Sequence, residues 1–212
     1  MSKSQVANSP LSLRARQAEA TRALIVQAAA GVFEVNGYRG ARMEDIATAA
    51  GVAYPTVYKA FANKRNLLAA AVQRAMTGGA EEQVQRQQWF TEQLVEPDAR
   101  RQLRLVARNA RQLNERAGRL LEVVRAAARA DEGIEAVWHD INDERLTRSR
   151  RTATALARKA QLRGTVAHAA RTLWTLTLPE LYGAQVHSGG MTPTAYERWL
   201  ADVLVAALLP DP

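Results

Sequence analysis

Side chains able to bind a polyanion are concentrated in one short stretch of the chain, residues 54–64. The stretch offers hydroxyl, methyl and ammonium groups and a proline, carried by Tyr54, Pro55, Thr56, Tyr58, Lys59 and Lys64. Groups of this kind bind phosphate oxygens and base edges in the major groove of DNA. Lys64 also stands at the expected start of a helix, where an ammonium group and free backbone N–H groups can bind a phosphate. The chemistry indicated is binding of nucleic acid.

Residues for other chemistries are scarce. The chain has no cysteine and only three histidines, which excludes disulfides and thiol chemistry and leaves too few ligands for a multi-histidine metal centre. No G-x-S-x-G, phosphate-loop or paired-carboxylate motif is present. Acidic residues near His139 have helical spacing that suits a metal, but no second cluster completes such a site. We therefore expect no cofactor and no metal, and an enzyme carrying a DNA-binding motif is the alternative from another class.

Positive charge is concentrated near the N-terminus. The 212 residues carry 29 Lys and Arg against 21 Asp and Glu, and residues 1–75 hold 10 of the basic and 4 of the acidic side chains. Most of the net charge of +8 therefore lies in the first third of the chain, which predicts a small polyanion-binding module followed by a larger one with another task. The longest apolar run near the C-terminus, 203–209, is too short to span a membrane, and the start of the chain lacks the apolar core of a secretory signal. We expect a cytoplasmic protein with no membrane partner.

The composition predicts an all-α fold of about nine helices. Strong helix formers are abundant, and alternating runs of β-branched residues are absent. Breaks are expected at Gly37 and Gly118, a kink at Pro179, and N-caps at Thr165 and Thr192. Apolar spacing and these signals place helices at 18–36, 43–50, 54–61, 98–115, 119–130, 133–163, 165–187 and 193–209. A further helix begins near Asn63, is weakened or kinked at Gly78-Gly79 and leads into the segment 81–94.

The short helices on either side of Gly51 are typical of a helix-turn-helix. Gly51 lies where the turn needs a positive φ, and Ala47 is small where two helices approach closely. Ile46 and Val57 supply a small core, so the helix that begins at Tyr54 presents its polar side outward. We divide the chain into a flexible basic tail (1–17), a helix-turn-helix DNA-binding domain (18–75), and a helical ligand-binding and dimerisation domain (76–212).

A known pattern is carried by Ala29, Phe33, Gly37-Tyr38, Ile46-Ala47, Ala50-Gly51-Val52, Thr56-Val57-Tyr58, Phe61, Lys64 and Leu67-Leu68. On these residues the chain resembles the DNA-binding domain of the TetR family of bacterial transcriptional repressors. The resemblance implies DNA contacts by Thr56, Tyr58, Lys59 and Lys64, with Tyr54 and Pro55 at the exposed start of the recognition helix. Arg42 and Ala53 stand where the family usually has a capping Ser or Thr, and Arg42 could instead contact a phosphate.

The resemblance also implies a function. TetR-family members are dimeric repressors, and a small, mainly apolar molecule would release this chain from a palindromic operator of double-stranded DNA. Ligand would shift the fourth helix and so change the separation of the two DNA-reading modules. Activation in place of repression, and an architectural DNA-binding protein without a small ligand, are the alternatives.

Three sets of residues in the second domain are candidates for its tasks. Aromatic residues that could line a ligand cavity are Trp89, Phe90, Trp138, Trp174 and Tyr182. Apolar stripes on the last two helices predict a two-fold interface through Leu173, Thr177, Leu181, Ala184, Tyr196, Trp199, Leu200, Val203 and Ala207. The same stripes could pack against the body of their own chain. We interpret the basic residues between Arg145 and Arg163 as a solvated helix face, with a second nucleic-acid surface as the alternative.

Overall fold

A computed structural model of the chain describes residues 13–79 and 84–210. Every element within those ranges is helical, which confirms the all-α prediction. The elements in order are α1 (Leu13–Gly40), α2 (Met43–Ala49), α3 (Tyr54–Phe61), α4 (Lys64–Thr77), the 3-10 turn η1 (Val84–Arg86), α5 (Gln88–Val95), α6 (Ala99–Ala128), α7 (Glu132–Ala157), α8 (Val166–Leu176), α9 (Pro179–Tyr182), the π-helical segment η2 (Gly183–Ser188) and α10 (Pro193–Leu208).

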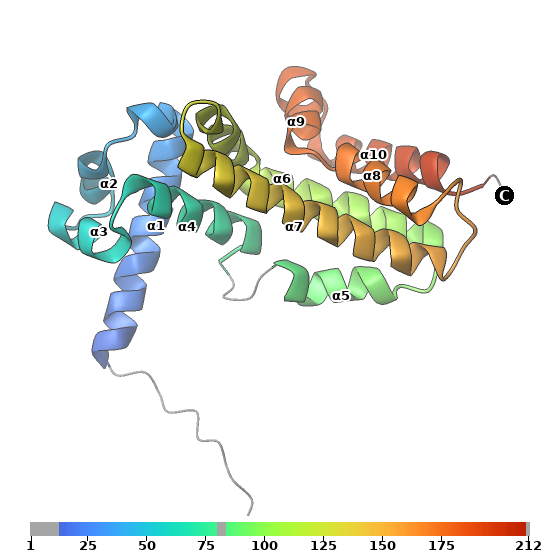
Figure 1. The fold of residues 1–212 in the computed structure, drawn as a ribbon, viewed down its shortest axis with the longest axis horizontal. Helices are drawn as coiled ribbons and strands as arrows, with labels where there is room; N and C mark the ends of the chain where they lie inside the picture. The colour runs from blue at the N-terminus through green and yellow to red at the C-terminus, as the bar shows by residue number, and fades with distance from the viewer. Residues whose placement is uncertain (1–12, 80–83, 211–212) are drawn as a thin grey trace, which may run out of the picture.

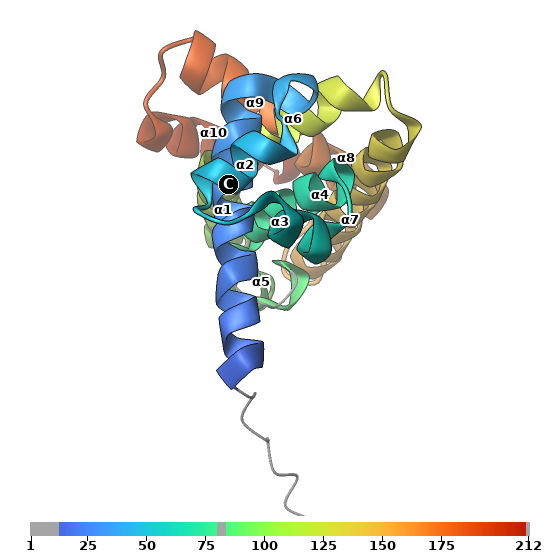
Figure 2. The same ribbon diagram turned by 90° about the vertical axis from the view of Figure 1, so that its left-hand side faces the viewer.

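The helices form two connected parts. Helices α1 to α4 gather at one end of the molecule, and the long helices α6 and α7 run side by side through the rest (Figure 1). In that view α5 lies beneath this pair, whereas α8 and α10 lie above it. Viewed from the end in Figure 2, α2 and α3 face the viewer. No helix in the described ranges has both the length and the apolar composition needed to cross a membrane.

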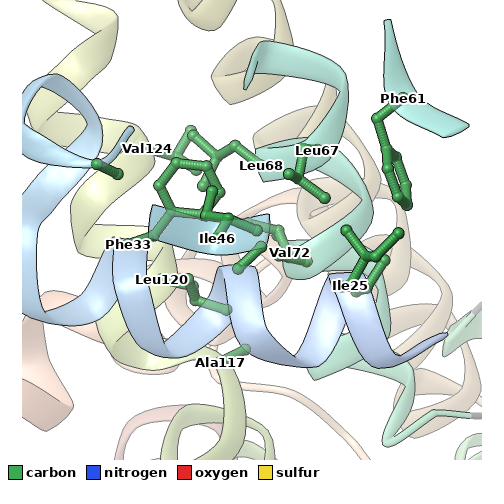
Figure 3. Packing of buried hydrophobic residues seen from close by; sticks show 14 of the residues in the cluster. Ile25, Phe33, Ile46, Phe61, Leu67, Leu68, Val72, Ala117, Leu120 and Val124 are labelled. Carbon is green, nitrogen blue, oxygen red and sulfur yellow. The ribbon is translucent and has the colours of Figure 1, made fainter. Parts of the chain in front are cut away.

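Two hydrophobic clusters hold these parts together, and α6 belongs to both. The first contains Ile25, Phe33 and Ile46 of the small helices together with Leu120 and Val124 of α6. Figure 3 shows these side chains meeting between α1, α4 and α6. The second cluster joins the other end of α6 to α7, α8 and α10. The N-terminal module therefore shares its core with the long helix behind it.

Local signals set most helix ends as expected. Gly37 interrupts α1 with φ 64° and ψ 177°, and Gly51 has φ 66° in the turn between α2 and α3. Thr165 and Thr192 cap α8 and α10, because their hydroxyls accept hydrogen bonds from the backbone N–H of His168 and Ala195. Of the predicted flexible tail, residues 13–17 are already helical, and residues 1–12 lie outside the described ranges.

Three predicted helices differ from those observed. Gly118 does not break α6, since a single glycine inside a long, well-packed helix is tolerated. Pro179 begins a new helix instead of kinking an existing one, because Leu178 before it is held in an extended conformation. Helix α7 ends at Ala157, before Gly164, and the following segment turns back over the second cluster, where Arg163 donates to Leu209 O at 2.7 Å.

The apolar stripe of α10 packs largely within its own chain. Tyr196 and Leu200 are fully buried, and Leu173 of α8 is 2% exposed. These three residues belong to the second hydrophobic cluster of their own chain, as the alternative to an interface predicts. Helix α10 packs on α6 and α8, and these two helices cover the apolar face of α10. The rest of the predicted interface lies at or near the surface: Thr177, Leu181, Ala184, Trp199, Val203 and Ala207.

The continuity of α6 gives a testable prediction. A Cβ atom added to Gly118 would meet nothing within 4 Å, so Gly118→Ala should stabilise the fold by about 0.5–1 kcal/mol through helix propensity. The melting temperature should rise by about 2 °C for a chain of this size. The matched variant Gly51→Ala should lower it, because φ there is +66°. A lower melting temperature for Gly118→Ala would show that α6 needs flexibility at this point.

Candidate nucleic-acid interface and an internal cavity

The helix-turn-helix has the core that its sequence predicts. Ile46 and Val57 are fully buried and Ala47 is 3% exposed, so α2 and α3 approach closely around small and branched side chains. Gly51 reverses the chain between them with its positive φ. This packing fixes which side of α3 faces inward. The opposite side is left for solvent or a ligand.

The outward side of α3 carries the predicted DNA-binding residues. Tyr54 and Tyr58 are 42% and 57% exposed, and their ring centroids lie 6.5 Å apart. Thr56 and Lys59 are exposed beside them, and Pro55 opens the helix. Ala53 at the N-cap makes no side-chain hydrogen bond, as its type predicts. The structure thus brings five of the seven predicted residues onto one short, exposed helix.

Arg42 lies apart from that helix at the start of α2. It occupies the N-cap position without capping the helix, and its side chain is 72% exposed. Its only acidic contact in the described part of the chain is Glu44, at 3.9 Å. An exposed ion pair of this length contributes little to stability, so the guanidinium group is available to another anion.

Lys64 makes contacts within the chain that the sequence did not predict. Its ammonium group donates to Ala41 O at 3.0 Å and Arg39 O at 3.5 Å, and it lies 4.6 Å from the ring centroid of Tyr38. These contacts tie the start of α4 to the connection between α1 and α2. The ammonium group therefore has two acceptors within the chain, and its phosphate contact stays a prediction. Charge and spacing alone do not reveal this, because Arg39 and Ala41 are more than twenty residues away.

Arg22 positions α3 and was missed by sequence reasoning. From α1 its guanidinium group donates to Ala60 O at 2.6 Å and lies 4.1 Å from the ring centroid of Phe61. It thereby fixes the C-terminal end of α3, next to Ala62, whose φ of 61° is unusual for a residue other than glycine. The pairing spans 38 residues of sequence, so no local pattern signals it.

A cavity of about 80 Å³ lies between α5, α6, α7 and the end of α8. Trp89 and Phe90 line it, as predicted. Trp138 packs in the first hydrophobic cluster and Tyr182 in the second, so these two predicted ligand residues do not line the cavity. Trp174 does not line the cavity either, but its ring centroid lies 5.9 Å from the guanidinium of Arg145, which does. Several polar residues line the cavity as well, including Gln93, Asn109, Asn114, Arg145, Arg148 and Thr152.

Two of these arginines overturn the interpretation of α7 as a solvated basic face at this point. Arg145 and Arg148 are 6% and 9% exposed and both line the cavity. Burial lowers the pKa of each guanidinium to about 10, and the neighbouring Arg148 charge adds to the effect on Arg145. Both groups therefore remain protonated at neutral pH. Sequence reasoning missed them because they stand in a run with Arg150 and Arg151, both of which are exposed.

The N-terminus of α7 touches the helix-turn-helix module. Asp131 caps α7 by accepting from the N–H groups of Gly133 and Ile134, and its carboxylate lies 3.5 Å from the Arg65 guanidinium of α4. Arg65 rests directly over Gly133. Tyr38 is part of the same group, since burial and then the Asp131 charge raise the pKa of its hydroxyl. Helix α7 thus connects the cavity to α4.

Among the described residues, no three or more His, Asp or Glu side chains are arranged to hold an ion. His139 instead lies 3.8 Å from Glu135 on the exposed side of α7. The acidic residues beside it line only a surface depression.

Comparison with protein families identifies the N-terminal module. Residues 25–71 match the sequence model of bacterial regulatory proteins of the tetR family. The matched range contains α2 and α3 and most of the cluster in Figure 3. No curated protein sequence is similar enough to the chain to count as a relative.

Solved structures share the fold over almost the whole chain. NalD, the secondary repressor of the MexAB-OprM multidrug efflux pump in Pseudomonas aeruginosa, is 22% identical with a TM-score of 0.70, over 93% of this chain and 100% of NalD. A SmeT–triclosan complex is 24% identical with a TM-score of 0.70, over 91% and 93% of the two chains. The regulator FadR from Bacillus subtilis, bound to stearoyl-CoA, is 21% identical with a TM-score of 0.69, over 87% and 97%. At these identities the likeness establishes the fold.

The role of Lys64 can be tested through stability. Lys64→Met should destabilise the protein by about 1–2 kcal/mol, because Ala41 O and Arg39 O lose a charged hydrogen-bond donor. Chemical denaturation measures this directly. Lys59→Met removes the same charge from an exposed position and should change stability by less than about 0.5 kcal/mol. Equal stability of the two variants would show that the contacts of Lys64 with Ala41 and Arg39 do not stabilise the fold.

Proposed function

Since residues 25–71 carry the DNA-binding domain of a TetR-family transcriptional regulator, we propose that the chain is a dimeric repressor released from a palindromic operator by a small molecule. The observation that carries this proposal is the exposed outer side of α3. It presents hydroxyl, aromatic and ammonium groups from a helix whose inner side is held in a shared core. The second part of the chain adds a cavity that DNA binding itself does not need.

DNA recognition falls to α3 in this proposal. Its N-terminal residues Tyr54, Pro55 and Thr56 enter the major groove first, with Tyr58 and Lys59 one turn further along. Arg42 binds a phosphate beside the groove, because it is exposed and weakly paired. Arg22 contacts no DNA and holds α3 at the angle needed. One helix of eight residues reads few base pairs, which is why a pair of chains is required.

A second copy of the chain supplies the other half of the recognition surface. The contact runs along the surface part of α10, through Trp199, Val203 and Ala207, with Leu181 and Ala184 beside it. These residues follow one another at helical spacing and remain at or near the surface of the single chain. A two-fold pair joined there would place two α3 helices on half-sites about 34–36 Å apart.

The effector acts through α7. A molecule in the cavity contacts the middle of α7, whose capped N-terminus is paired with Arg65 of α4. A small displacement along this rigid helix changes the position of α4 and hence of α3. SmeT bound to triclosan and FadR bound to stearoyl-CoA are support by analogy, since this fold holds small molecules in those proteins. Coupling of this kind is reciprocal, so operator DNA must weaken effector binding by the same factor.

DNA binding through α3 predicts a defined loss in one variant. Duplexes selected from a random library should bind with a logarithmic affinity that falls by about 0.9 per phosphate contact for each tenfold rise in salt. Lys59→Ala combined with Tyr58→Phe should weaken binding of the selected duplex by about 1–3 kcal/mol, as measured by fluorescence anisotropy. The control Arg171→Ala removes an exposed charge from α8 and should have no such effect. Unchanged affinity of the double variant would remove α3 from the interface.

The dimer contact predicts a monomeric variant. Val203→Asp places an unpaired charge in the proposed interface and should shift the protein from dimer to monomer in light scattering. Because Val203 lies near the surface of one chain, circular dichroism should show that the fold is kept. Loss of the dimer should also lower the affinity for the palindromic duplex. Thr154→Asp, on the exposed side of α7, is the matched control, and a Val203→Asp variant that stays dimeric would place the interface elsewhere.

A further inference from the structure

The cavity holds two positive charges that have been almost entirely removed from water. Arg145 and Arg148 lie three residues apart, so they project from the same side of α7 into the same space. Isolating a charge from water is costly unless a partner of opposite charge or a set of hydrogen bonds compensates it. What compensates each guanidinium decides what the cavity can bind.

Arg145 is compensated by the protein. It donates to Thr177 O at 3.1 Å, to Trp174 O at 3.5 Å and to Asn142 Oδ1 at 3.3 Å. The two carbonyls lie at the C-terminal end of α8, where a helix carries partial negative charge. Arg145 therefore joins α7 to α8, and its charge has a structural use.

Arg148 has no equivalent set of acceptors. The nearest carboxylate, that of Glu144, lies 3.7 Å from Nη1, beyond hydrogen-bond distance, and its side chain is 49% exposed. Nη1 itself makes no hydrogen bond in the described part of the structure. Asn114, across the cavity on α6, is 3% exposed, and its Nδ2 also lacks an acceptor there. Both unmet groups are donors, so the cavity is complementary to a molecule that brings acceptors.

Part of the remaining wall is apolar, beside further polar residues such as Gln93, Asn109 and Thr152. Trp89, Phe90, Leu113 and Leu173 contribute aromatic and aliphatic surface opposite the polar groups. A volume of about 80 Å³ is roughly half of the 150 Å³ cavity that accommodates benzene. The space therefore fits a small acceptor group with a short apolar body.

We propose that the cavity binds a small organic carboxylate, whose oxygens accept hydrogen bonds from Arg148 and Asn114 while its apolar body lies against Trp89 and Phe90. A carboxylate matches the planar guanidinium in two-point contact and brings a negative charge within hydrogen-bond distance, closer than that of Glu144. This inference rests on the proposed function in that the bound carboxylate is the effector. It changes the expected effector from a mainly apolar molecule to an amphipathic anion.

The test compares carboxylates with their neutral amides. Acetate, butyrate and benzoate are titrated against acetamide, butyramide and benzamide, with tryptophan fluorescence and melting temperature as readouts. At least one carboxylate should bind ten or more times as tightly as its amide. Equal binding of acid and amide throughout, or no binding by any carboxylate, overturns the proposal.

Variants separate ligand binding from folding. Arg148→Met should abolish the preference for carboxylates. The ligand-free melting temperature should stay the same or rise, because a buried charge with no hydrogen bond at Nη1 and only a distant, half-exposed carboxylate is replaced by an apolar side chain of similar length. A purely structural arginine would give the opposite result, a clear drop in that temperature. Arg148→Gln provides a second neutral variant, and Arg150→Met on the exposed side of α7 should bind like the parent protein. Retained preference in both Arg148 variants overturns the assignment.

A third arm adds the selected operator duplex. Release of the duplex by the carboxylate and not by the amide supports both the anion site and the repressor mechanism. Carboxylate binding without release supports the site and contradicts the proposed mechanism. Duplex binding with no carboxylate affinity overturns the site and leaves DNA recognition by α3 intact.

Discussion

The helix-turn-helix module does not bury its core by itself, and the C-terminal half of α6 supplies the missing side. Phe33 and Ile46 are fully buried because Leu120 and Val124 close over the same cluster. The other half of the same helix is built into the second cluster. Since a packed core deforms little, the angle between the recognition helix and the rest of the chain is set by where α6 lies. Helix α6 also lines the cavity, so the same helix connects the cavity wall to the core that holds α3.

Most helix ends were predictable because they depend on residues whose effect is confined to neighbouring positions in the sequence. Gly51, Gly37, Thr165 and Thr192 each perform a task that depends on backbone conformation or on a hydrogen bond to a residue four or fewer positions away, so their roles can be deduced from sequence. Gly118 led to a wrong prediction of a helix break, because glycine is tolerated within a helix that packs against several neighbouring helices. The extent of α7 was likewise decided by contacts with distant segments.

The site was predictable only on its outward side. Tyr54, Thr56, Tyr58 and Lys59 are exposed because an inward stripe of α3 is apolar, and that stripe is visible in the sequence. Arg22, Lys64 and Arg148 are different. Each is a basic residue on an amphipathic helix, so the three look alike in the sequence. Arg22 positions α3, Lys64 joins α4 to the α1–α2 connection, and Arg148 lines the cavity. These roles depend on contacts with residues distant in the sequence. The stripe of α10 shows the same ambiguity, since α6 and not a second chain covers Tyr196 and Leu200.

The contact between Arg65 and the first turn of α7 depends on the absence of a side chain at position 133. Any residue larger than glycine would collide with the guanidinium and displace it from Asp131. Position 133 belongs neither to the outer side of α3 nor to the cavity wall. Under the proposed function, substitutions on the outer side of α3 or in the cavity wall would change DNA or effector specificity and leave this junction unchanged. If the contact between Arg65 and the start of α7 is kept, DNA specificity and effector specificity could each change independently of the other. The same fold could then combine many effectors with many operators.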